Sequence, residues 1–143
     1  MKLLQRKIDK ILRDWKQTEN KMPLIVKGAR QIGKTASIMQ FATENYKNVI
    51  AINFVLQKKY KAIFDDSYEV EDIVRNITLI DPSLNFEAGN TLIFFDELQD
   101  CPACATSLKA FCIDGRYDVI CSGSLMGINY REIESNSVGY KQD

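Results

Sequence analysis

The sequence predicts an α/β fold in which a mainly parallel sheet lies between two layers of helices. Short apolar segments at 23–27, 49–54, 91–95 and 117–121 have the length and β-branched content of buried strands. Segments with helical spacing of apolar residues separate them, which is the order that produces a parallel sheet covered on both faces. The chain has 143 residues, enough for one domain with its own core.

The first predicted helix precedes the first strand. Leu4, Ile8, Ile11, Leu12 and Trp15 fall on one face of this helix, and that face is expected to pack on the core. A contact of Trp15 with a nucleotide base is the alternative for this aromatic residue.

Three further helical segments are expected downstream. Residues 58–64 and 70–77 lie between the second and third strands, with Asp66 and Glu69 at the spacing of a capping box before the second of them. Residues 102–112 follow the third strand and begin with a proline, which suits the first turn of a helix.

Composition and charge restrict the class of protein. No apolar run approaches the ~20 residues that a membrane helix needs, and the N-terminus is too charged for a secretory signal. A cytoplasmic location with reduced cysteines is therefore expected. Residues 1–34 hold ten Lys or Arg and three Asp or Glu, whereas residues 65–100 hold one Arg and ten acids. The basic segment suits an anionic nucleotide or an acidic partner, and it is not a strong nucleic-acid footprint.

Residues 28–35 carry the phosphate-binding pattern G-x-x-x-x-G-K-[ST] between the first strand and a helix. Glycines let such a loop turn its backbone N–H groups toward a phosphate chain. Lys34 is then expected to reach the β and γ phosphates, and the Thr35 hydroxyl to bind Mg²⁺. The predicted nucleotide-binding residues are Gly28, Ala29, Arg30, Gln31, Ile32, Gly33, Lys34, Thr35 and Ala36.

A second group of polar residues follows the third strand. Four apolar residues bury that strand, so Asp96 and Glu97 emerge at the carboxyl edge of the sheet, where ligands bind in open α/β folds. Asp96 is expected to hold the Mg²⁺ with Thr35, and Glu97 to activate the attacking water. The chain has no histidine, so a general base must be a carboxylate, a lysine, a tyrosine or a cysteine. The alternative is that these acids only favour the start of the next helix.

Ser122 and Ser124 follow the fourth strand at the same edge. A hydroxyl there is placed to donate to the γ-phosphate or to the attacking water, and a plain Ser-Gly turn is the alternative. Lys34, Glu97 and Ser122 are therefore the predicted catalytic residues.

The three motifs together resemble those of AAA-type ATPases, and in particular a widespread, mostly uncharacterised prokaryotic group of them. The resemblance rests on the loop at 28–35, on Asp96-Glu97-Leu98-Gln99 and on Ser122-Gly123-Ser124. It implies Walker A and Walker B roles for the first two motifs and a sensor role for Ser122. It also implies a three-layer α-β-α P-loop NTPase fold whose fourth strand lies between the first and third. The chain is expected to be an incomplete AAA-type ATP-binding domain over 1–143 that lacks the last strand and the lid.

The expected function is binding of ATP with Mg²⁺ and slow hydrolysis that acts as a conformational switch for a partner or a further domain. Arg116 and Arg131 match no arginine-finger motif, so a partner or a second copy is expected to supply one. The alternatives are a small-molecule kinase and a nucleotide-dependent module that binds nucleic acid or protein without significant turnover.

The cysteines offer a competing interpretation. Cys101 and Cys104 form a C-x-x-C pair at the start of a helix, a setting found in redox dithiols. A zinc site completed by Cys112 and Cys121 is a second alternative. Inert packing is favoured over both because neither explains the phosphate loop.

Overall fold

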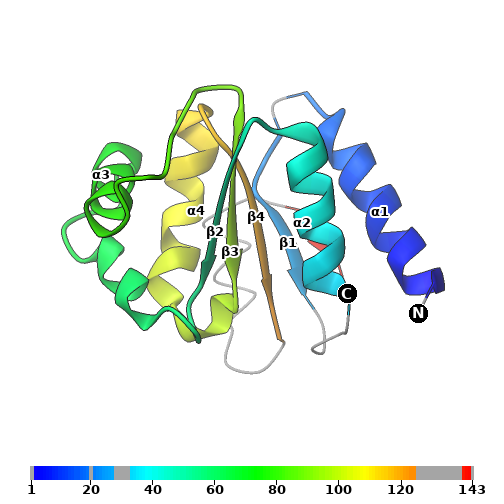
Figure 1. The fold of residues 1–143 in the computed structure, drawn as a ribbon, viewed down its shortest axis with the longest axis horizontal. Helices are drawn as coiled ribbons and strands as arrows, with labels where there is room; N and C mark the ends of the chain where they lie inside the picture. The colour runs from blue at the N-terminus through cyan, green and yellow to red at the C-terminus, as the bar shows by residue number, and fades with distance from the viewer. Residues whose placement is uncertain (1, 20, 28–32, 125–139, 143) are drawn as a thin grey trace.

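The computed structural model describes residues 2–19, 21–27, 33–124 and 140–142. These residues form one sheet of parallel strands in the order β2-β3-β4-β1-β5 (Figure 1). The strands are β1 (Leu24–Lys27), β2 (Asn48–Asn53), β3 (Thr91–Asp96), β4 (Asp118–Gly123) and β5 (Tyr140–Gln142). Because β4 lies between β1 and β3, the strand order that the family resemblance implies is confirmed.

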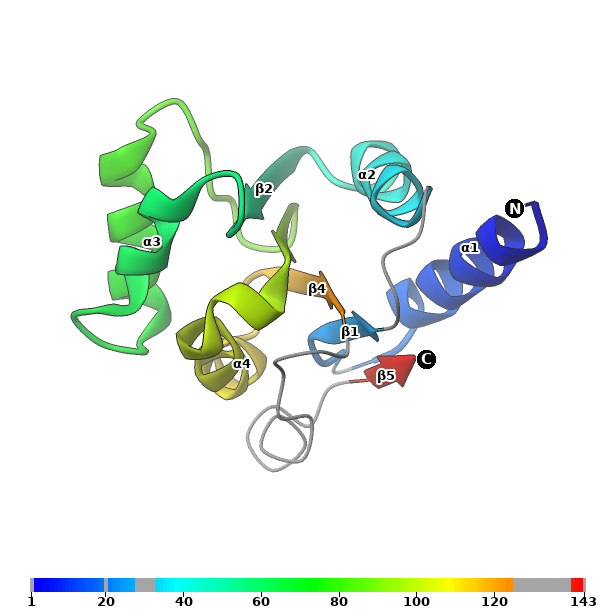
Figure 2. The ribbon, with the colours of Figure 1, turned by 90° about the horizontal axis from the view of Figure 1, so that it is seen from below.

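Helices cover both faces of this sheet (Figure 2). α1 (Lys2–Lys16) and α2 (Lys34–Asn45) lie on one face, whereas α3 (Val70–Ile80) and α4 (Pro102–Asp114) lie on the other. Two 3₁₀ segments, η1 (Lys58–Phe64) and η2 (Leu98–Asp100), join the strands to the helices of the second face. Among the described residues, no helix combines the length and apolar character needed to cross a membrane.

The core has two layers because successive side chains of a strand point to opposite faces. On β3, Ile93 and Phe95 pack in the cluster that includes side chains of α3 and α4. Leu92 and Phe94 pack in the other cluster, with side chains of α1 and α2. All four are buried, so the apolar run that predicted this strand is explained by burial on both faces.

Trp15 lies in α1 and packs in the core layer between α1, α2 and the sheet. Its side chain is 2% exposed, its ring lies 6.3 Å from that of Phe41, and its Nε1 donates to the Met22 carbonyl at 2.7 Å. An indole held in this way fills the core and has its polar atom satisfied. Packing, rather than contact with a base, therefore accounts for this residue.

Two details differ from the sequence-based expectations. Residues 140–142 pair with β1, so a fifth strand is present where the last strand was expected to be lacking. Residues 58–64 are helical as expected, and their helix is of the 3₁₀ type. The capping box before α3 does not form, because Glu69 is the N-cap without a side-chain bond and Asp66 accepts from Asn76 at 3.1 Å. Short segments such as these are decided by tertiary contacts more than by local pattern.

Candidate functional site

The start of α2 brings a lysine and a threonine to the carboxyl edge of the sheet. Gly33 precedes the helix with φ 95° and ψ −15°, a left-handed conformation that glycine adopts without a Cβ clash. Lys34 and Thr35 follow in the first turn, and the Lys34 side chain is 7% exposed. A helix N-terminus of this kind favours anions because its first N–H groups have no partner within the helix.

Only the last part of the predicted phosphate loop can be placed. Gly33, Lys34, Thr35 and Ala36 are described, whereas Gly28, Ala29, Arg30, Gln31 and Ile32 lie outside the described residues. The nucleotide-binding role of the whole loop therefore stays a prediction.

Asp96 is the last residue of β3, and hydrogen bonds from its neighbours fix its carboxyl group. Ser122 Oγ and the backbone N–H of Glu97 donate to Oδ1 at 2.7 and 2.9 Å. Thr35 Oγ1 and Asn53 Nδ2 donate to Oδ2 at 3.4 and 3.3 Å. The donors come from β2, α2, β4 and the turn after β3, so four separate segments meet at this carboxyl group.

Asn53 lies at the carboxyl edge of the sheet, here called the rim, and the sequence-based site did not include it. It ends β2 directly opposite Asp96, and its Oδ1 also accepts from the backbone N–H groups of Val55 and Leu56 at 2.9 Å. The signal was present in the sequence, since a polar residue follows the apolar run of β2. Such a residue must reach the same edge as Asp96 in a parallel sheet.

Glu97 has an unusual backbone. Its φ of 60° and ψ of 51° are left-handed, and it is the only non-glycine residue with positive φ in the described part of the chain. That conformation costs about 1–2 kcal/mol for an L-residue. Strained residues of this kind gather at functional sites, where surrounding contacts hold them. One such contact is the bond from Gln99 Nε2 to Glu97 Oε1 at 2.7 Å.

A small pocket of about 40 Å³ lies at this rim. It exceeds the ~10–15 Å³ needed for one water molecule, so an ion with part of its hydration shell fits. Its lining includes carboxylate and hydroxyl groups, whose hard oxygen atoms are the ligands that Mg²⁺ takes in proteins. Five predicted site residues line it: Lys34, Thr35, Asp96, Glu97 and Ser122, together with Gly123 and Ser124.

A larger cavity of about 530 Å³ lies at the opposite end of β4. Size alone would favour it as a ligand site. Its charged members Lys21 and Asp118 form an ion pair at 3.6 Å, and the Tyr46 hydroxyl donates to Asp118. Burial, with the Asp118 carboxylate beside it, raises the pKa of Tyr46. The cavity contains no residue of the three predicted motifs. It is lined by Lys21, Met22, Pro23, Phe111, Cys112, Ile113, Gly115, Tyr117, Asp118 and Val119.

The cysteines show neither of the alternative chemistries. Burial raises the pKa of the Cys101 thiol, and burial together with the neighbouring Cys121 raises that of Cys104. A redox dithiol needs the opposite, because the thiolate is the reactive form. Within the described ranges, no three His, Cys, Asp or Glu side chains are grouped so that they could hold a metal ion.

Thiol reactivity is therefore expected to be confined to Cys112, which is partly exposed whereas the other three are buried. In a titration of the folded protein with an aromatic disulfide reagent near pH 7.5, one thiol should react fast and three slowly. Cys112→Ser should remove the fast phase. If a fast phase survives in that variant, Cys101 or Cys104 is reactive and the packing interpretation is wrong.

Several solved structures share this fold. A chain of a Drosophila ORC structure, solved with AT-rich DNA and Cdc6, aligns with a TM-score of 0.59 at 11% identity, covering 99% of this chain and 57% of that one. The Orc1 protein of Aeropyrum pernix, in complex with DNA, gives 0.54 at 15% identity over 96% and 43% of the two chains. PCH-2 of C. elegans gives 0.50 at 12% identity over 97% and 40%. The chain thus spans about half the length of these structures.

Sequence comparison identifies the family. No curated protein matches this chain. A family model described as an AAA domain matches residues 20–143, which contain β1 to β5, the rim pocket and all three predicted motifs. The expected P-loop NTPase-like α/β fold is confirmed by this match together with the structural neighbours. The chain belongs to the AAA domain family.

Proposed function

We propose that this chain binds ATP with Mg²⁺ and hydrolyses it slowly. Membership of the AAA family supports nucleotide binding and an ATPase-type function. The observation that carries the finer proposal is the shared rim pocket, where Lys34 from the phosphate-loop motif meets Asp96 and Glu97 from the end of β3. A P-loop ATPase needs a cation for the phosphates, ligands for the metal and a group that orients water.

Each rim residue has a role in this proposal. Lys34 binds the β and γ phosphates, and residues 28–36 surround the phosphate chain with backbone N–H groups. Thr35 and Asp96 hold Mg²⁺. The Thr35 hydroxyl lies 3.4 Å from the Asp96 carboxylate, and this proximity supports the assignment of both residues to one metal ion. When bound, the metal neutralises charge that develops on the transferred phosphoryl group.

The remaining step is activation of water. Glu97 accepts a proton from the water that attacks the γ-phosphate, and its place in the pocket lining with Asp96 supports this role. Ser122 donates to Asp96 at 2.7 Å and lines the same pocket, which supports a role in sensing the γ-phosphate at the end of β4. Movement of these loops with the nucleotide would make the domain a switch.

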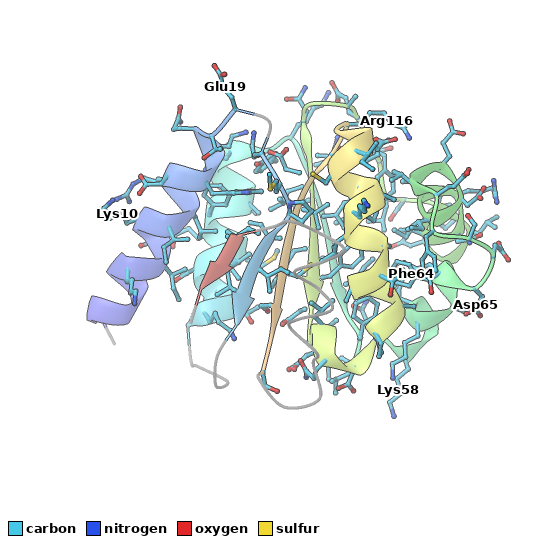
Figure 3. All side chains as sticks on the ribbon, turned by 180° about the vertical axis from the view of Figure 1, so that it is seen from behind. Lys10, Glu19, Lys58, Phe64, Asp65 and Arg116 are labelled. Carbon is cyan, nitrogen blue, oxygen red and sulfur yellow. The ribbon has the colours of Figure 1, made fainter. Side chains whose placement is uncertain are left out.

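Slow turnover follows from the charges at the rim. Among the described residues, Lys34 is the only cation that lines the pocket. The Arg116 guanidinium donates two hydrogen bonds to Asp114, at 2.8 and 3.0 Å. Arg116 and Lys58 lie at opposite ends of the molecule (Figure 3). Arg131 lies outside the described residues. We infer that a partner or a second copy of the chain supplies an arginine finger, which is worth ~10³–10⁵ in turnover.

A turnover assay with the purified chain tests this proposal. ATP with Mg²⁺ should be hydrolysed well below about 1 s⁻¹, the lower end of the range for dedicated kinases. Titration with ATP and GTP analogues should show preference for adenine, as expected for an AAA-type ATPase. A rate above about 1 s⁻¹ for the isolated chain would show that no added arginine is needed.

Two alternatives remain open to the same assay. Nucleic-acid dependence is permitted by the basic segment at 1–34, and two of the matched structures contain DNA. Duplex DNA that raises the rate would support it. Transfer of phosphate to a small molecule instead of water would identify a kinase. Glu97, directly after Asp96, suits activation of water better than transfer to a bound acceptor. A cytoplasmic location also stays part of this proposal.

A further inference from the structure

The Gln99 side chain connects the ends of β3 and β4. It lies in the 3₁₀ turn η2, two residues after Glu97. Its Nε2 donates to Glu97 Oε1 at 2.7 Å, and its Oε1 accepts from the backbone N–H of Ser124 at 3.1 Å. Both ends of one carboxamide are therefore engaged, one by a carboxylate and the other by the backbone after β4.

These two bonds fix the orientation of the amide. A carboxylate oxygen accepts and a backbone N–H donates, so only the orientation with Nε2 toward Glu97 satisfies both partners. Hydrogen bonds to an ionised carboxylate are shorter and stronger than neutral ones. Rotation of the Gln99 amide would lose both bonds together, which makes the side chain a directional link rather than a general polar contact.

The link reaches the strand end that carries the predicted sensor. Ser122 and Ser124 both line the rim pocket, and Ser122 Oγ also donates to Asp96. A shift of this strand end would move the Ser124 N–H, and the Gln99 amide would follow it. Since Glu97 already has a strained left-handed backbone, its carboxylate depends on such contacts for its position.

We propose that Gln99 is a positioning residue that orients the Glu97 carboxylate according to the position of the β4 end. This rests on the proposed ATPase function and adds its regulation: the Ser122–Ser124 segment and the water-activating group respond together to the nucleotide. Gln99 needs no contact with the nucleotide for this role. It sets the geometry in which Glu97 meets water, so it affects turnover more than affinity.

Two substitutions at Gln99 separate its two bonds. Gln99→Met keeps the length of the side chain and removes both bonds. Gln99→Glu keeps the acceptor for the Ser124 N–H but sets a second carboxylate against Glu97. Gln40 provides matched controls, because it donates to Glu44 at 3.5 Å on the exposed face of α2, outside the rim pocket.

Gln99→Met should lower kcat roughly 10²-fold, the cost of a misplaced catalytic group. The dissociation constant for ATP with Mg²⁺ should stay within about threefold, because phosphate and metal contacts are retained. Gln40→Met should match the unsubstituted chain in both. If Gln99→Met turns over normally while the unsubstituted chain hydrolyses ATP, or loses binding and turnover in parallel, Gln99 does not position Glu97.

The turnover of Gln99→Glu gives a second readout. This variant keeps the acceptor for the Ser124 N–H but sets a carboxylate in place of the Nε2 donor against Glu97 Oε1, so its kcat should fall at least as far as that of Gln99→Met. Gln40→Glu should turn over like the unsubstituted chain. Normal turnover of Gln99→Glu, in a chain that hydrolyses ATP, would overturn the positioning role.

A measurement that does not depend on turnover distinguishes failure of the ATPase proposal from failure of the Gln99 proposal. If the unsubstituted chain hydrolyses no ATP, the ATPase proposal fails, and NMR still tests the link. The amide resonance of Ser124 should move in Gln99→Met, and the Gln99 carboxamide resonances should move in Glu97→Gln. Neither should move in Gln40→Met. Unchanged resonances in the first two variants would overturn the link.

Discussion

Replacing Lys34 by alanine is expected to weaken ATP binding severely. Lys34 is 7% exposed and lines the rim pocket with Asp96 and Glu97, and no other described cation lines that pocket to replace it. Removing one partner of a buried charge pair costs about 2–5 kcal/mol, which corresponds to a loss of roughly 30- to 4,000-fold in affinity. Calorimetric titration of Lys34→Ala with a non-hydrolysable ATP analogue and Mg²⁺ measures this loss.

The matched control is Lys47→Ala. Lys47 pairs with Glu87 at 3.3 Å, and 70% of its side chain is exposed. Its removal should leave both affinity and thermal unfolding almost unchanged, since exposed ion pairs contribute little. Alanine is a good helix former, so Lys34→Ala should fold. Binding of ATP by Lys34→Ala with nearly unchanged affinity would contradict the assignment of the phosphate site.

Glu97→Gln is expected to separate binding from hydrolysis. The amide has almost the same shape and can still accept a hydrogen bond from Gln99, but it cannot take a proton from water. Turnover should fall by ~10²–10⁴, the contribution typical of a positioned general base. Affinity for ATP with Mg²⁺ should be retained, so the variant should hold ATP without cleaving it. Single-turnover assays and recovery of bound nucleotide measure the two effects separately.

Glu44→Gln serves as the control for this prediction, because Glu44 lies on the exposed face of α2. It should turn over at the rate of the unsubstituted chain. Normal turnover of Glu97→Gln would show that another group activates water. Asp96 would then need to be tested next, since it lines the same pocket.

The fold was predictable from local patterns where burial is extreme. β3 is apolar from Leu92 to Phe95 because it is covered on both faces, and that run placed Asp96 at the edge of the sheet. A parallel sheet then brings the ends of β1, β3 and β4 together, which is why Lys34 and Asp96 line one pocket. The pocket therefore follows from topology rather than from any contact that the sequence displays.

The features that escaped prediction depend on tertiary contacts. The hydrogen bond from Asn53 to Asp96 joins two strands, and the bond from the Ser124 N–H to Gln99 joins η2 to the residue after β4, so no spacing within one segment encodes them. The left-handed backbone of Glu97 is equally hidden, because a glutamate has no preference for it. β5 was not expected because it is three residues long and gains its stability by pairing with β1.

A crystal structure with a non-hydrolysable ATP analogue and Mg²⁺ tests the central claim most directly. We expect the β and γ phosphates beside Lys34, and the metal at about 2.1 Å from the Thr35 hydroxyl, the usual Mg²⁺–oxygen distance. Asp96 should bind the same metal directly or through water. Phosphates and metal bound elsewhere, for example in the cavity beside Lys21 and Asp118, would contradict the account.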